Sequence, residues 1–90
     1  MARKRRDETP EYKEFVSAVL KRDKHTCQMP GCNCRYRKKL EVHHIIRYAD
    51  SVNLRHEVGN GITLCKKCHY EIRNKEKHFI EMFMRIINDK

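Results

Sequence analysis

Four cysteines stand in two close pairs whose spacing suits a metal ion. Cys65 and Cys68 form a C-x-x-C motif, and Cys27 and Cys32 enclose four residues that include Pro30-Gly31. A C-x-x-C knuckle lets two thiolates grip one zinc ion, and a Pro-Gly turn brings the other two thiolates together. The sequence therefore predicts one structural zinc site made of four cysteines.

A fifth cysteine, Cys34, leaves one part of that assignment open. Cys34 could replace Cys32 in the zinc shell, but the Pro-Gly turn ends at Cys32, so we favour Cys32 and expect Cys34 to be a free thiol. An odd number of cysteines also argues for metal ligation over disulfides. The clustering of four of them argues against scattered, inert thiols.

Histidines form a second set of donors. The ring of His69, directly after the C-x-x-C motif, would point away from the zinc tetrahedron. Upstream, His43 and His44 lie in the strand-like run Leu40–Ile46, where adjacent side chains point to opposite faces. One of them can hold a metal while the other faces a different target only if the backbone bends there. The pair alone suits an ordinary surface, but with Asn60 and His69 it indicates a nuclease site.

Such residues fit the chemistry of phosphodiester hydrolysis. The reaction requires a deprotonated water in line with the leaving oxygen, and a cation that neutralises charge on the phosphorane and the departing alkoxide. A neutral histidine, with a reference pKa near ~6.5, can take that proton at physiological pH.

An N-terminal helix is predicted from Thr9, which suits an N-cap, and Pro10, which suits the first helical position. Its apolar residues recur at the spacing of one helical face. They are Tyr12, Phe15, Val16, Val19 and Leu20. We expect this helix to cover the zinc cysteines.

Two strands and two more helices complete the predicted elements. The strands are expected within Leu40–Ile46 and Ile62–Cys65, antiparallel to each other, with a loop over Tyr48–Gly59 between them. A helix carrying His69 should begin at Lys66. An amphipathic helix over residues 76–88 is expected to pack against the N-terminal helix. Its apolar residues are Phe79, Ile80, Phe83, Ile86 and Ile87.

The composition points to one small domain that meets a polyanion. Ninety residues bury a modest core, so a structural metal is the expected staple. Lys and Arg number 21 against 12 Asp and Glu, a net charge of +9, which favours nucleic acid as partner. No stretch is apolar enough to span a bilayer or to direct export, so a cytoplasmic protein is expected.

The basic residues supply the candidate contacts to nucleic acid. Residues 1–8 are predicted to be a flexible basic tail ahead of a single domain over residues 9–90. Its charge fits phosphate contact and simple solvation equally well. The candidate contacts are Arg3, Lys4, Arg5, Arg6, Arg35, Arg37, Arg47 and Arg55.

These motifs together resemble the signature of the HNH endonuclease family. The resemblance rests on Leu40–Ile45, on Asn60 and on Leu64–His69, and it extends over roughly Phe15 to Arg73. The two cysteine pairs are similar to those of its zinc-stapled branch. The resemblance implies a small α+β fold of the ββα-metal type, with a structural four-cysteine zinc site and flanking N- and C-terminal helices.

The resemblance also implies a role for each site residue. His43 and His69 would bind one catalytic divalent ion, His44 would be the general base, and Asn60 would tie the loop between the strands in place. Many members carry Asp where this chain has His43, and an all-imidazole pair is a softer site. We therefore expect Mn²⁺, Ni²⁺ or Co²⁺ to support activity at least as well as Mg²⁺. Arg47 stands where proline is frequent, and it could grip the scissile phosphate.

The favoured function is a metal-dependent DNA endonuclease that nicks or cuts with little sequence preference. Small members of this kind resemble phage nucleases of DNA processing or packaging, which implies a bacterial or phage-infected cytoplasm and leaves room for a partner protein. A zinc-stabilised nucleic-acid-binding module without catalysis, and a nuclease component of a restriction or toxin system, stay open as alternatives. So do a monomer and a weak homodimer.

Overall fold

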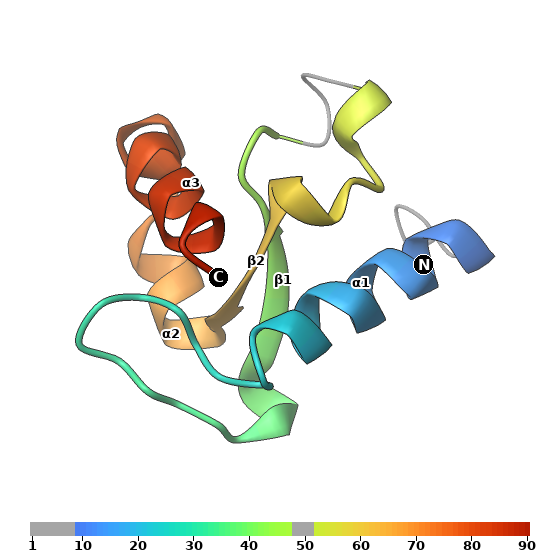
Figure 1. Ribbon diagram of the computed structural model, residues 1–90. Coiled ribbons are helices and arrows are strands. Elements are labelled where there is room, and N and C mark those ends of the chain that lie inside the picture. The colour runs from blue at the N-terminus through green and yellow to red at the C-terminus, as the bar shows by residue number, and fades with distance from the viewer. Residues whose placement is uncertain (1–8, 48–51) are drawn as a thin grey trace, which may run out of the picture.

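A two-stranded antiparallel sheet positions everything else in the fold. Strand β1 (Leu40–His44) pairs with β2 (Gly61–Cys65), so that Leu40 lies opposite Cys65 and His44 lies opposite Gly61 (Figure 1). The computed structural model describes residues 9–47 and 52–90, and the predicted basic tail lies outside these ranges. Both strands fall inside the predicted segments, apart from the added Gly61.

Helix α1 (Pro10–Arg22) starts where the sequence predicts it. The Thr9 hydroxyl oxygen accepts a hydrogen bond from the Tyr12 backbone N–H at 3.2 Å, which satisfies one of the free donors of the first turn. Phe15 and Val19 are its buried residues. Their ring and methyl groups face the sheet at Gly61, where a Cβ atom would come within 2.7 Å of Val19 Cγ2. Only a glycine allows α1 to approach β2 this closely.

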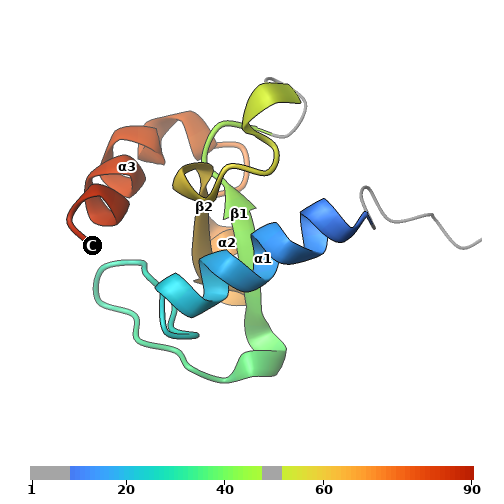
Figure 2. The same cartoon turned by 45° about the vertical axis from the view of Figure 1, so that its right-hand side comes forward.

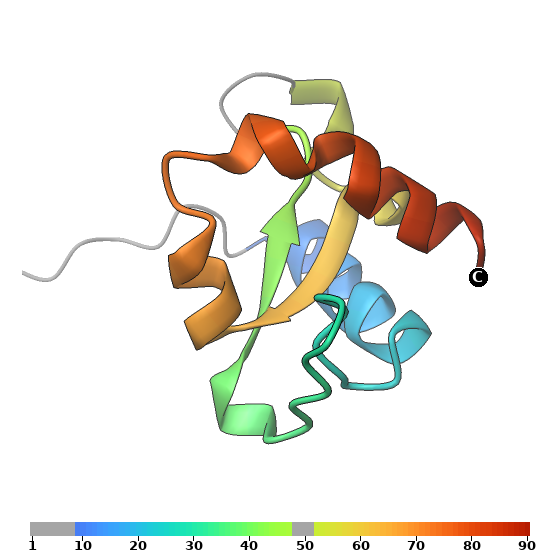
Figure 3. The ribbon, with the colours of Figure 1, turned by 90° about the vertical axis from the view of Figure 1, so that its left-hand side faces the viewer.

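The remaining helices lie on the other side of the sheet. Helix α2 (Lys66–Glu71) follows β2 directly, and α3 (Ile80–Asn88) is preceded by a turn of 3-10 helix, Glu76–Phe79. Figure 2 shows α1 in front of the strands with α2 behind them, and Figure 3 shows the face over which α2 and α3 lie. The fold is thus three layers, with the thin sheet in the middle.

Two of the packing expectations are wrong. The apolar group that contains the zinc cysteines includes Phe83 and Ile87 of α3 and no residue of α1, so α3 covers the cysteines. Helix α1 instead covers the opposite face, and α3 does not pack against it (Figure 1). An apolar stripe shows that a helix buries one face, but it does not specify which surface covers that face.

A buried ion pair fixes the end of α1 to the sheet. The Asp23 carboxylate accepts hydrogen bonds from two nitrogens of Arg22, both at 2.9 Å, and from the Thr63 backbone N–H at 2.9 Å. Arg22 also donates to the carbonyl oxygens of Val58 at 2.8 Å and Gly61 at 2.7 Å. A buried charge is tolerated when it is paired and hydrogen-bonded in this way. The clamp holds α1 in register with β2.

The arrangement confirms the predicted fold class. The two antiparallel strands are followed by α2, which gives the ββα order. Helix α1 precedes this unit in the sequence and α3 follows it, and the four cysteines lie close enough to share a metal ion. In the part of the chain that the structure describes, no helix has both the length and the apolar character that a bilayer crossing requires.

Candidate metal centre and active site

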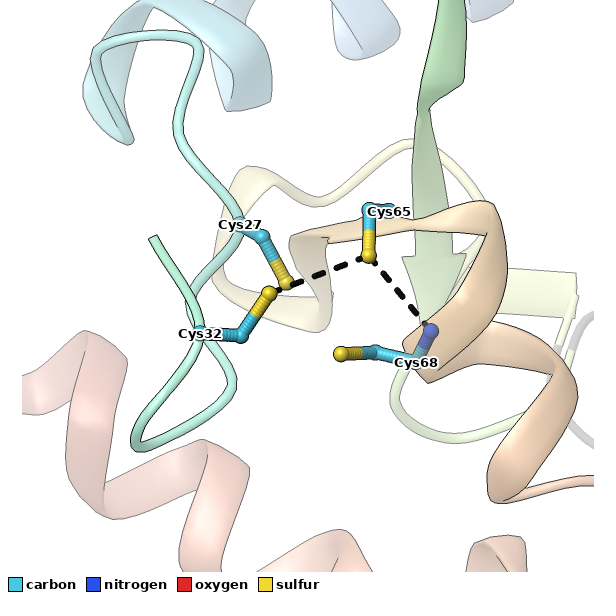
Figure 4. A group of neighbouring side chains, drawn as sticks. All are labelled: Cys27, Cys32, Cys65 and Cys68. Carbon is cyan, nitrogen blue, oxygen red and sulfur yellow. Dashed lines mark hydrogen bonds between the residues drawn. The ribbon is translucent and has the colours of Figure 1, made fainter. Parts of the chain in front are cut away.

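The four predicted zinc cysteines converge. The sulfur atoms of Cys27, Cys32, Cys65 and Cys68 all lie within 4.8 Å of one another, and Figure 4 shows them pointing toward a common centre. The Sγ atoms of Cys32 and Cys65 are 3.9 Å apart. A tetrahedral zinc site with Zn–S bonds of ~2.3 Å requires sulfurs about 3.8 Å apart. The group is therefore positioned to bind a metal ion and is compatible with structural zinc.

Local backbone structure places each thiol. The Cys32 backbone N–H donates to the Met29 carbonyl at 2.9 Å, which closes the Pro30-Gly31 turn, and Gly31 has a φ of +86°. Cys65 ends β2 and caps α2, because its sulfur accepts a hydrogen bond from the Cys68 backbone N–H at 3.5 Å. The first pair thus comes from a turn and the second from a strand–helix junction. Among the described residues Cys34 is not part of the group.

The thiols of Cys27, Cys65 and Cys68 differ in how easily they ionise. Burial raises the pKa of Cys27 and of Cys68. Burial acts in the same direction on Cys65, but hydrogen bonds from the Cys68 backbone N–H and the neighbouring thiols outweigh it and lower the pKa of Cys65 to about 7. Burial therefore opposes ionisation of Cys27 and Cys68, and a bound metal ion would favour their thiolate forms by balancing the charge.

A second cluster lies between β1 and α2, where the rings of His43 and His69 meet with their centroids 5.1 Å apart. His43 is only 6 % exposed, and its Nε2 is a buried atom without a hydrogen-bond partner in the described structure. Burial, and secondly the neighbouring His69, lower the pKa of His43 to about 4. His43 is therefore neutral at physiological pH, which is the form in which imidazole binds metals.

The surroundings of the pair are closed on one side and open on the other. The ring of Phe83 meets His43 edge to face at a centroid distance of 5.7 Å and covers it from α3. His69, by contrast, has a side chain that is 33 % exposed and borders a shallow open groove. The residues lining this groove are Glu41, Lys66, His69, Tyr70, Arg73 and Glu76. A metal ion bound by a histidine that borders an open groove would keep a coordination position that a substrate can reach.

Glu41 is a site residue that the sequence interpretation missed. One of its carboxylate oxygens lies 2.7 Å from Nδ1 of His69. Glu41 stands two residues before His43 in β1, and residues at that spacing share one face of a strand. The period of two along β1 could have identified it.

His44 contacts a different part of the molecule from His43. Its ring stacks on that of Phe15 in α1 at a centroid distance of 5.0 Å, and the ring of Tyr12 lies 6.2 Å away. Its Nε2 lies 3.0 Å from the carbonyl oxygen of Arg55. A carbonyl oxygen can only accept, so this bond places the proton on Nε2. The structure therefore does not bring His44 into the His43–His69 pair.

Asn60 is buried at the junction of loop and strand. Its side-chain oxygen accepts from the Ile46 backbone N–H at 2.8 Å, and its side-chain nitrogen donates to the carbonyl oxygens of Ile46 at 3.1 Å and Leu54 at 3.2 Å. Its own carbonyl accepts from the Ile45 N–H at 2.8 Å. These bonds join the segment that leaves β1 to the turn that enters β2.

The predicted cationic contacts that the structure describes lie toward the two ends of β1. Arg35 and Arg37 are exposed ahead of β1, whereas Arg47 and Arg55 follow the other end of that strand. The four basic residues from Arg3 to Arg6 lie outside the described ranges. Lys66 and Arg73, beside the histidine pair, are cations that the sequence interpretation did not single out.

Comparison with known proteins identifies one family. The model of the HNH endonuclease family matches residues 27–75, which include both cysteine pairs, Asn60 and the candidate histidines His43, His44 and His69. No protein of curated function and no solved structure matches the chain. The family match indicates nuclease chemistry, with nucleic acid as the substrate, and agrees with the ββα arrangement of the two strands and α2.

Proposed function

The chain belongs to the HNH endonuclease family, and from this premise we propose that it is a metal-dependent DNA endonuclease with little sequence preference. The observation that carries the proposal is the meeting of His43 and His69, with ring centroids 5.1 Å apart, at the edge of an open groove. The neighbouring His44 supplies the base that hydrolysis requires.

His43 and His69 would hold the catalytic ion. The buried, unpartnered Nε2 of His43 and the low pKa of that ring fit a metal ligand, because a neutral imidazole offers a lone pair without first losing a proton. The chemistry supplied by such an ion, when bound, is stabilisation of the charge that builds on the phosphate and the leaving oxygen. Two imidazoles suit Mn²⁺, Ni²⁺ or Co²⁺ at least as well as Mg²⁺.

His44 acts as the general base in this proposal. With the proton of its Nε2 directed to the Arg55 carbonyl, Nδ1 is the nitrogen that accepts a proton from water. The stacked Phe15 ring restricts the imidazole to one orientation. His43 and His44 leave β1 on opposite faces, so in this proposal the scissile phosphate would have to lie near the end of the strand, within reach of both the ion at His43 and the ring of His44.

Asn60 has a positioning role in the same proposal. By bonding to both backbone groups of Ile46 and to the Leu54 carbonyl, its side chain holds the loop that carries Arg55. The Arg55 carbonyl in turn orients His44. The side chain of Asn60 therefore acts on the base through the loop and does not touch substrate.

Cations on several sides of the site would bind DNA through its phosphates. Lys66 and Arg73 line the groove beside His69, and Arg47 follows the end of β1. Arg35, Arg37, Arg55 and the basic residues 3–6 would add sequence-independent attraction. We further propose that the chain is a member of the zinc-stapled branch of the family, with a single domain over residues 9–90 and a role in phage DNA processing or packaging inside the cytoplasm.

A supercoiled-plasmid nicking assay tests the proposal. Wild-type protein loaded with zinc is compared with His44→Ala in EDTA, Mg²⁺, Mn²⁺ and Ni²⁺, with His78→Ala, an exposed histidine of the 3-10 turn, as the matched control. We expect metal-dependent nicking by the wild type and the control, and a loss of about 10²- to 10⁴-fold in His44→Ala.

The assay has two outcomes that would contradict the proposal. Full activity of a folded His44→Ala variant would refute the assignment of the base. Absence of nicking by folded, zinc-loaded wild type with every metal would favour a nucleic-acid-binding module without catalysis, or a nuclease component that requires a partner.

A further inference from the structure

We propose that Glu41 is a positioning residue that fixes the orientation and tautomer of His69 and thereby sets the affinity of the site for its catalytic divalent ion. This inference rests on the proposed nuclease function and deepens it. The juxtaposition that carries it is the 2.7 Å contact between a Glu41 carboxylate oxygen and His69 Nδ1.

The contact determines which nitrogen of His69 is available to a metal. An ionised carboxylate can only accept a hydrogen bond, so the proton between the two atoms belongs to Nδ1 of a neutral His69. The lone pair of the ring is then on Nε2. The nitrogen of His43 that is buried without a partner is also Nε2. Glu41 thus makes the two histidines present the same kind of donor.

Stability alone is a poor explanation for the Glu41–His69 pair. The side chains are 38 % and 33 % exposed, and even a full ion pair with this much exposure would contribute little to the free energy of folding. A carboxylate on the outer nitrogen of a metal-binding histidine, however, raises the basicity of the ring and holds its direction. The placement of Glu41 on the His43 face of β1 serves that purpose.

Glu41 does not lie close enough to both histidines to share a metal ion with them as a third ligand. In residues 9–47 and 52–90 the four cysteines form the one set of three or more His, Cys, Asp or Glu donor atoms close enough to share an ion. Glu41 therefore acts through His69. Glu76 lines the same groove, and its charge acts on His43, where it favours the protonated ring. Among the described residues, the carboxylate that contacts the His69 ring is that of Glu41.

The affinity for Mn²⁺ is the first test. Mn²⁺ competes poorly for thiolates, so it titrates the histidine site without displacing zinc from the cysteines. Free Mn²⁺ is followed by electron paramagnetic resonance in zinc-loaded wild type, Glu41→Ala and Glu41→Gln. The control, Glu81→Ala, removes the same charge from α3, where the glutamate side chain is 88 % exposed. We expect Glu41→Ala to weaken Mn²⁺ binding about 10- to 100-fold, Glu41→Gln to weaken it less, and the control to leave it unchanged.

The tautomer of His69 is the second test and requires no catalytic ion. Long-range ¹H–¹⁵N spectra of the zinc-loaded protein are recorded well above the ordinary histidine pKa of ~6.5. Wild type should show His69 protonated on Nδ1, and Glu41→Gln, whose carbonyl still accepts, should keep that form. Glu41→Ala should shift the ring toward the Nε2–H tautomer that free histidine favours.

The two measurements separate failure of this inference from failure of the proposed function. The positioning role alone is overturned if the wild type nicks DNA and binds Mn²⁺ but Glu41→Ala keeps the wild-type Mn²⁺ affinity. An unchanged His69 tautomer in Glu41→Ala has the same consequence. Equal, complete loss of Mn²⁺ binding in both Glu41 variants with unchanged tautomer would make Glu41 a direct ligand. Wild type that neither binds Mn²⁺ nor nicks DNA would overturn both. If Glu41→Ala fails to fold, the Mn²⁺ affinity of Glu41→Gln is the test. Weaker Mn²⁺ binding than in the wild type supports the positioning role, and wild-type affinity overturns it.

Discussion

The cysteine group and the histidine pair share α2 but differ in how they are enclosed. Cys68 is buried and its sulfur faces three others, whereas His69, the next residue, is one-third exposed and borders a groove. Neighbouring residues on one short helix thus serve a closed group of four donors and an open pair of two. Closed sites with four protein ligands are structural, and sites with an open position are catalytic.

The difference indicates that the residues that stabilise this small fold are separate from those proposed to act in catalysis. The cysteine group lies in the apolar core with Phe83 and Ile87, so any ion there would add to folding directly. The histidine pair lies at the edge of that core, where one ring is covered and the other is accessible. Changes at the two places should therefore have separable effects on folding and on activity.

The strongest test of this division is Cys68→Ala. We expect the protein to unfold, because structural zinc contributes about 10–16 kcal/mol in small zinc domains and net stabilities are only about 5–15 kcal/mol. Circular dichroism and zinc content measure the effect. Cys34→Ala, outside the group, is the control and should fold with zinc bound. A zinc-free Cys68→Ala protein with a native spectrum would remove the structural role.

His69→Ala should produce the reverse pattern. If His69 is the proposed metal ligand, its loss should reduce nicking in Mn²⁺ by at least about 100-fold, since changes to residues that only support a ligand already reduce activity by about 10- to 100-fold. The melting temperature and the zinc content should stay close to the wild-type values. His78→Ala again provides the control. Loss of zinc from His69→Ala would mean that the two metal sites are not separable.

Asn60→Ala should affect folding and activity together. The side chain makes three hydrogen bonds, and their removal takes partners from the half-buried N–H and carbonyl of Ile46 and one of two donors from the Leu54 carbonyl. We expect a loss of about 2–4 kcal/mol in the free energy of unfolding, measured with urea, and a decrease in nicking because the loop orients His44. The exposed Asn53 supplies the control variant, Asn53→Ala, with little effect. A stable but inactive Asn60→Ala protein would argue for direct contact with substrate.

The smallest effect is expected for Gly61→Ala. The added methyl group would lie 2.7 Å from Val19 Cγ2 and 2.8 Å from Phe15 Cζ, so α1 must move away from the sheet. Overpacking of this kind costs about 1–3 kcal/mol. Gly59→Ala is the matched control, because nothing lies within 4 Å of a Cβ there. Equal melting temperatures of the two variants would show that α1 does not depend on close approach at Gly61.

Much of the candidate site was predictable because its signals are local. The C-x-x-C spacing and the Pro30-Gly31 turn each bring two sulfurs together locally, although the meeting of the two pairs depends on the fold. The Thr9 cap depends on residues within one helical turn. The alternation of side chains along β1 separates His43 from His44. Each of these features involves residues that are near one another in the sequence.

The tertiary structure decided what distant segments do to one another. It placed α1 against Gly61 and His44 and α3 over the cysteines, whereas the sequence analysis expected α1 over the cysteines and α3 against α1. It also brought Glu41 to His69, 28 positions away. The sequence by itself determined the donor atoms and the elements that carry them. Which surfaces pack together depends on the combined shape of all elements, so only the folded chain settles which side chains meet.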